Sequence, residues 1–151
     1  MTSFGAVKAL HLLGAVVWVG GMFFALLVLR PSMPVLEPPL RLALHRQVFH
    51  RFFRIVWHVV PIVLASGYAL VFLGFGGFRG AAWPVHVMHA TGLLMTAVFI
   101  ALFFGPWRAL RTAMDTDDRA TAVANVERIR KLIQINLLLG LATVALASLG
   151  G

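Results

Sequence analysis

Residues 4–29, FGAVKALHLLGAVVWVGGMFFALLVL, decide the fold of this chain. A bilayer core about 30 Å thick needs about 20 apolar residues of helix to cross it. This stretch is longer than that, and Lys8 is its one charged residue. The run is too long for a signal peptide and no small-x-small cleavage motif precedes Arg30, so we expect a retained transmembrane helix that stops at Arg30-Pro31.

The composition extends this reading to the whole chain. Of 151 residues, 60% are apolar and 12% are charged, whereas a soluble domain has about 45–50% apolar and about 25% charged residues. This excess excludes soluble enzyme folds and indicates an integral membrane protein. Because cysteine is absent, disulfides, thiolate zinc sites, iron–sulfur clusters and cysteine nucleophiles are excluded as well.

Three further segments are long and apolar enough to span a bilayer: residues 55–75, 83–107 and 132–149. The prediction is an all-α fold, an integral membrane four-helix bundle formed by a single domain over residues 1–151. Helical extensions should prolong it on one side, because Glu37-Pro38-Pro39 is typical of a helix start. The third helix should run on to about Met114.

The last connection should contain a turn and an N-cap at residues 115–118. Beyond it, the fourth helix should carry an apolar face made of Val123, Val126, Ile129 and Ile133.

The basic residues predict the orientation. The net charge is +8, but these residues flank apolar runs, which favours topology charges over nucleic-acid binding. Only Lys8 and Arg79 lie on the side of the termini; the other eleven of the thirteen Lys and Arg residues lie in the first and third connections. The positive-inside rule then puts both connections, with their helical extensions, in the cytoplasm and both termini outside a bacterial-type inner membrane.

Histidines are the main candidates for chemistry, because ionisable residues inside a membrane are costly and no Asp or Glu lies within a span. At a rise of about 1.5 Å per residue, His11 lies roughly 10 Å and His89 roughly 9 Å below the outer surface. His86 lies one turn above His89, so we expect these three imidazoles to form one outer site. Met88 adds a soft ligand to it.

Several other residues are weaker candidates. Lys8 and Arg79 could pair with haem propionates, and Trp18 lies deep on the same helical stripe as His11. His58 enters from the opposite side, so we expect it at a separate inner location. It has most simply a packing role there, or it serves as a ligand of a second haem if the protein binds haem.

Polar and small residues outside this set have plainer expected roles. His45 and His50 should face solvent or headgroups. Gln134 and Asn136 should form hydrogen bonds between helices. Gly14 and Gly21 allow close approach of either a partner helix or a flat cofactor.

Two ligands suit this outer site. Imidazole and thioether groups are borderline and soft ligands that suit copper, and two imidazoles from opposing helices are also a way to hold haem b. A third interpretation is a structural or assembly protein whose histidines only pack. The residues identify no catalytic group, and association into a homo-oligomer stays open.

The run Lys8-Ala9-Leu10-His11, followed by Trp18 and Gly20-Gly21, resembles the first helix of the CopD-like membrane proteins. It also resembles the related HemJ-type protoporphyrinogen oxidases. The segment from Arg46 through Phe53 to Pro61 and Gly67, and the opening of the third helix from Trp83 to His86, are similar too.

The two resemblances imply different ligands. CopD-like proteins are associated with copper uptake or resistance, whereas HemJ-type proteins bind haem b and use a helix-one His and a helix-three Lys. Aligning His86 with the helix-three His of that pattern places Met88 at the lysine, so the resemblance favours CopD. The expected function is copper binding or transport at a site between the first and third helices, with a b-type haem redox protein as the alternative.

Overall fold

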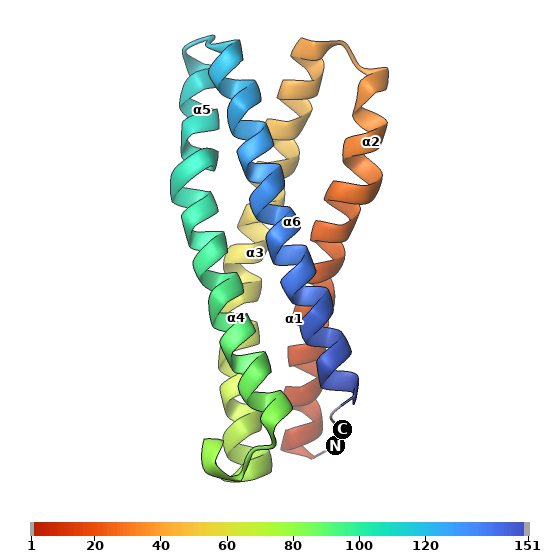
Figure 1. Ribbon diagram of the computed structural model, residues 1–151, viewed down its shortest axis with the longest axis vertical. Helices are drawn as coiled ribbons and strands as arrows, with labels where there is room; N and C mark the ends of the chain where they lie inside the picture. Colours follow the sequence, from red (N-terminus) through yellow and green to blue (C-terminus); the bar gives the residue numbers. More distant parts are fainter. Residues whose placement is uncertain (1, 150–151) are drawn as a thin grey trace.

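The computed structural model describes residues 2–149, which contain helices and turns but no strand. The chain makes four passes that run alternately up and down (Figure 1). Each pass is a helix long and apolar enough to cross a membrane: Ser3–Val35, Pro38–Phe75, Trp83–Asp115 and Arg119–Leu149. This confirms the predicted all-α membrane bundle.

The first pass consists of α1 (Ser3–Phe24), a π-helical turn η1 (Ala25–Leu29), α2 (Arg30–Ser32) and a 3₁₀ turn η2 (Met33–Val35). The second pass is α3 (Pro38–Phe75), which η3 (Phe78–Gly80) follows. The third pass consists of α4 (Trp83–Leu102), the π-helical turn η4 (Phe103–Trp107) and α5 (Arg108–Asp115), and the fourth is α6 (Arg119–Leu149).

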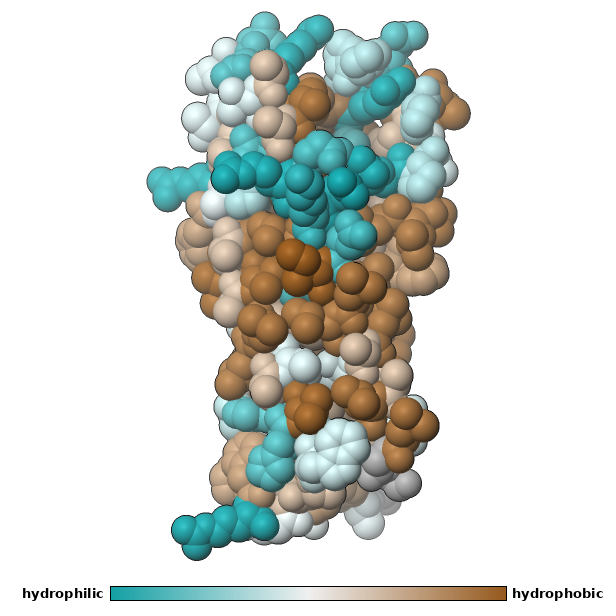
Figure 2. Space-filling model, in the orientation of Figure 1, coloured by the Kyte–Doolittle hydropathy of each residue, from teal (hydrophilic) through white to brown (hydrophobic). Residues whose placement is uncertain are grey.

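The turns that join the first pass to the second and the third to the fourth lie at one end of the bundle, here the connection end (Figure 1). The start of α1 and the end of α6 lie at the other, here the terminal end (Figure 1). The helix α3 has 38 residues, about 57 Å at about 1.5 Å per residue, and a bilayer core is only about 30 Å thick. Figure 2 shows the apolar belt in the middle and hydrophilic side chains gathered toward the connection end. The helices therefore extend beyond the membrane there, and α3 begins at Pro38, as the Glu37-Pro38-Pro39 pattern predicts.

The helices form a closed ring in which α1 packs along α3, and α4 and α5 pack along α6. Additional contacts join α1 to α6 and α3 to α4, so α1 and α4 face each other across a diagonal. The turn at the end of α3 needs glycine, because Gly76 has a φ of 66° and Gly77 a φ of 120°. The amide of Gly76 closes the helix on the carbonyl of Phe72.

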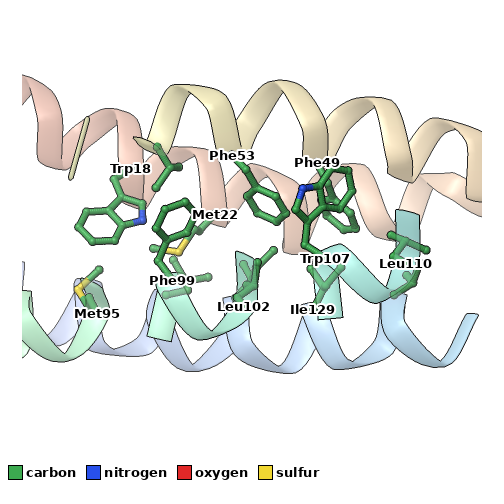
Figure 3. Packing of buried hydrophobic residues seen from close by; sticks show 14 of the residues in the cluster. Trp18, Met22, Phe49, Phe53, Met95, Phe99, Leu102, Trp107, Leu110 and Ile129 are labelled. Atoms are coloured by element: carbon green, nitrogen blue, oxygen red, sulfur yellow. The ribbon is translucent and has the colours of Figure 1, made fainter. Parts of the chain in front are cut away.

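The core is densest toward the connection end, where aromatic rings from α3, α4 and η4 interlock (Figure 3). Phe53 is 1% exposed and stacks on Phe49 at 5.5 Å between ring centroids. Its ring also meets the ring of Trp107 edge-on at 5.3 Å. Offset and edge-to-face aromatic pairs of this kind add to the packing energy.

Polar side chains join α6 to α4 within the span. Asn136 is 3% exposed and its Nδ2 donates to the carbonyl of Met95 at 3.0 Å. Thr143 donates through its hydroxyl to Thr91 at 2.8 Å. Asn136 therefore has the predicted interhelical role, whereas the prediction is wrong for Gln134, which is exposed and accepts from Arg130 of its own helix.

Two further local predictions are wrong. The first helix does not stop at Arg30-Pro31 but continues to Val35. The amide of Arg30 bonds to the carbonyl of Ala25, five residues back, and this wider π turn makes room for the ring of Pro31, which would otherwise clash with the preceding turn.

The second concerns the apolar face of α6. Val126, Ile129 and Ile133 are buried as predicted, but Val123 is 53% exposed and Ala122 takes the core position at 1%. A small residue fits there because α5 approaches α6 closely beside the short turn between them.

Candidate functional site

His11 on α1 is half-buried and points at α3. Its Nδ1 lies 3.0 Å from the carbonyl oxygen of Val63 and 3.0 Å from the hydroxyl of Ser66. A carbonyl can only accept a hydrogen bond, so Nδ1 must carry the proton and donate it. In the neutral ring Nε2 then keeps its lone pair, which makes Nε2 the atom available to a metal or haem iron.

His86 and His89 on α4 lie together on the other side of α3, around the ring of Phe78 in η3. The centroid of the Phe78 ring is 6.0 Å from that of His86 and 4.8 Å from that of His89. His89 also meets Tyr68 of α3 edge-on at 5.3 Å. His86 is exposed, while His89 and Met88 are half-buried.

The structure places His11 and His89 against the same turn of α3 but on different faces of it. His11 contacts Ser66 and lies next to Gly67, whereas His89 contacts Tyr68. At about 100° per residue, Tyr68 points roughly 100° away from Gly67 and roughly 160° away from Ser66. The two imidazoles therefore share a depth, but they do not meet.

In residues 2–149, no three His, Cys, Asp or Glu side chains come close enough to hold one metal ion together. At the terminal end, the pair His86 and His89 could supply two imidazole ligands to one metal ion. Met88 lies between them in the sequence, and soft thioether and imidazole ligands favour Cu(I).

Helix packing fills the space beside the glycines at which two helices approach closely. A Cβ added at Gly14 would lie 2.6 Å from Val63 Cγ2, and one at Gly67 would lie 3.1 Å from His11 Cε1. At Gly21 an added Cβ would overlap the ring of Phe52. From the sequence, either a partner helix or a flat cofactor could lie beside Gly14 and Gly21. In the structure, α3 lies there.

The remaining candidates lie apart from each other. Lys8 and Arg79 are both exposed, and neither belongs to an ion pair within the described part of the chain. Trp18 is 3% exposed and lies in the core (Figure 3). His58 is exposed on α3, and its Nδ1 lies 2.7 Å from the carbonyl of Arg54 in its own helix.

Sequence reasoning missed two features. Ser66 is 4% exposed and contacts Nδ1 of His11; the signal in the sequence was a serine beside Gly67 in a largely apolar span. His45 was expected to face solvent, but it is half-buried and lines a cleft with Met33 and Arg30 at the connection end. Other passes of the chain form the rest of this cleft, so the sequence around His45 carries no signal of its burial.

Comparison with known proteins identifies the family. The model of the family described as Copper resistance protein D matches residues 46–149, from the first half of α3 to the end of α6. The matched residues include His58, Arg79, His86, Met88 and His89. Helix α1, with Lys8, His11 and Trp18, precedes the matched segment. No curated protein and no solved structure matches this chain. The matched segment is more than half of the chain, and this chain therefore belongs to the Copper resistance protein D (CopD) family.

Proposed function

We propose that this protein binds copper, as Cu(I), at the terminal end of the bundle and passes it through or along the membrane. The proposed ligands are His86 and His89 of α4 beside η3, together with Met88 from the same helix, whereas His11 lies apart on the other face of α3. One observation carries the proposal: the rings of His86 and His89 gather around the ring of Phe78.

The charge distribution supports copper over harder cations. All five acidic residues, Glu37, Asp115, Asp117, Asp118 and Glu127, belong to the connection end of the sequence, so no Asp or Glu side chain lies near His86 and His89. Hard cations need oxygen ligands, whereas imidazole and thioether are the donors this end provides.

The basic residues also support an orientation in which the copper ligands face the outside of the cell. Nearly all Lys and Arg lie at the connection end, which by the positive-inside rule is cytoplasmic in a bacterial-type inner membrane. The copper ligands then face outward, where an ion arriving from outside the cell first meets the protein.

Haem b is the second candidate, because the Nδ1–H form of His11 leaves Nε2 free to serve as an axial ligand. Packing of α3 into the glycine positions beside His11 weighs against a flat cofactor at that face. The absorbance spectrum of the purified protein separates the two candidates, since haem gives an intense Soret band and Cu(I) does not.

The test is an anaerobic Cu(I) titration of the purified full chain against a chromophoric chelator. His86→Ala and His89→Ala should each weaken Cu(I) binding at least about tenfold, which corresponds to about 1.4 kcal/mol. The double variant should lose little more, because both ligands serve one ion.

His50→Ala is the matched control, because His50 is an exposed histidine of α3 near the connection end. Cu(I) affinity equal to wild type in both α4 variants would overturn the proposed site. A Soret band that His11→Ala abolishes would replace copper by haem.

A further inference from the structure

A cleft at the connection end lies between η1 and α2 on one side and α3 and α6 on the other. Leu26, Phe49 and Ile133 form its apolar floor, and Arg30, Arg130 and His45 lie around it. The enclosed part measures about 20 Å³, enough for one water molecule. Any larger ligand must therefore sit at the mouth of the cleft.

The π turn η1 forms one wall of the cleft. Ala25, Leu26 and Leu29 of this turn all line it, and Arg30 follows directly, with its amide bonded to the carbonyl of Ala25. Single π turns inside α-helices are frequent at functional sites. Leu27 and Val28, on the outside of the same turn, are 57% and 45% exposed and present an apolar surface next to the arginine.

Two guanidinium groups share one carboxylate at this mouth. Glu127 accepts from Nη2 of Arg30 at 2.6 Å and from Nε of Arg130 at 2.9 Å. Arg30, Arg130 and Glu127 together carry one excess positive charge, because two guanidiniums face one carboxylate. Several N–H donors stay free, because each guanidinium has five of them. This excess charge disfavours a metal cation there, even though Met33 and His45 line the same cleft.

The location matches the boundary of the membrane. Figure 2 shows hydrophilic side chains directly above the apolar belt on the face where α6 crosses in front of the bundle. The side chains of Arg30 and Arg130 are 41% and 27% exposed, so they are oriented by Glu127 yet still accessible. Basic pockets between helices at this level are suited to anionic lipid headgroups.

We propose that Arg30 and Arg130, which both contact Glu127 at the mouth of the cleft, bind the phosphate of an anionic phospholipid. The acyl chains lie outside the cleft along the exposed apolar surface of η1. That surface favours a lipid over free phosphate, because an inorganic ion gains nothing from Leu27 and Val28. The site is independent of the copper ligands at the opposite end.

The test compares thermal unfolding of the full chain in nanodiscs of phosphatidylcholine with nanodiscs that also contain phosphatidylglycerol. Native mass spectrometry counts the lipid that stays bound. Wild type should unfold at a higher temperature with phosphatidylglycerol, and Arg30→Gln or Arg130→Gln should lose that shift. Arg128→Gln is the control, because Arg128 is an exposed arginine of the same helix that does not line the cleft, and it should keep the shift.

Glu127→Gln separates lipid binding from a purely structural ion pair. Removing the carboxylate breaks the ion pairs as the arginine variants do, but it leaves both guanidiniums free, so the phosphatidylglycerol shift should persist or grow. Loss of the shift in Glu127→Gln as in Arg30→Gln would overturn the proposal, as would loss in Arg128→Gln. Equal stabilisation by inorganic phosphate in phosphatidylcholine nanodiscs, at matched ionic strength, would assign the site to the free ion instead.

Discussion

Replacing Gly14 by alanine should push α1 away from α3 beside His11. The added Cβ would lie 2.6 Å from Val63 Cγ2, whereas nonbonded carbons pack at about 3.5–4.0 Å. The new methyl therefore requires about 1 Å of movement, either of the helices or of the Val63 side chain. Val63 also supplies the carbonyl that accepts from His11, so the same movement disturbs the ring of this candidate ligand.

The expected magnitude comes from two opposing terms. Overpacking a tight contact costs about 1–3 kcal/mol, while Gly→Ala within a helix gains up to about 1 kcal/mol. Gly20→Ala is the matched control on the same helix, since a Cβ there would meet no atom within 4 Å. Gly20→Ala should stabilise slightly, and the two variants should differ by the overpacking cost alone, about 1–3 kcal/mol.

The assay is reversible unfolding by SDS in mixed micelles, followed by far-UV circular dichroism. Fluorescence of the four tryptophans, one of which, Trp18, lies one turn further along α1, provides a second probe. Val63→Ala removes the clashing methyl, so Gly14→Ala should cost less in that background. The double-mutant cycle should give a coupling energy of about 1 kcal/mol or more between the two positions.

Two results would refute this reasoning. One is a Gly14→Ala variant as stable as Gly20→Ala. The other is a cost of Gly14→Ala that stays the same after Val63→Ala. Either would mean that α1 does not pack on α3 at this level, and the placement of His11 against Ser66 would fall with it.

Three further predictions concern the site, the topology and a helix cap. His11→Ala combined with His89→Ala should reduce Cu(I) binding by the sum of the single effects, because the two rings lie on different faces of α3; strong non-additivity in the titration would show one shared site. A reporter active only in the cytoplasm, fused after Gly151, should be silent, and an active fusion would reverse the orientation. Asp118→Ala should lower the unfolding temperature, since Asp118 caps α6 by accepting from the amide of Thr121 at 3.1 Å. Hydrogen bonds from Thr121 lower the pKa of Asp118, so this stabilisation is present above its ordinary pKa and is lost as the pH falls through the lowered value; a wild-type pH profile with no such loss would contradict the role.

The sequence predicted the passes well because the signal for them is local. Continuous apolar runs identified four membrane helices, and the Glu37-Pro38-Pro39 pattern identified the start of α3 at Pro38. Pro31 misled the prediction, because a proline usually ends a helix. Here the π turn before it lets the helix continue to Val35, and nothing in the residues around Pro31 distinguishes a wide turn from a stop.

The faces of the helices were harder to predict than their lengths. Val126 and Ile129 are buried as the helical spacing indicates, but Val123 is exposed and the smaller Ala122 is buried instead. Apolar character marks either a core face or a lipid-facing surface in a membrane helix, so hydropathy alone does not tell these two apart. His45 shows the same problem, since its burial depends on η1 and α6 from other passes.

The sequence by itself determined that this is a four-pass membrane protein, which end carries its basic residues, and that His11 and His89 lie at the same level of the bundle. These properties follow from composition and from a rise of about 1.5 Å per residue along a helix. Only the tertiary structure decided that His11 meets Ser66 while His86 and His89 gather around Phe78. It also decided that α3 fills the space beside Gly14 and that Arg30 and Arg130 converge on Glu127. Depth is a local quantity that one helix sets for itself, whereas the side on which two residues meet depends on how separate helices rotate and pack against each other.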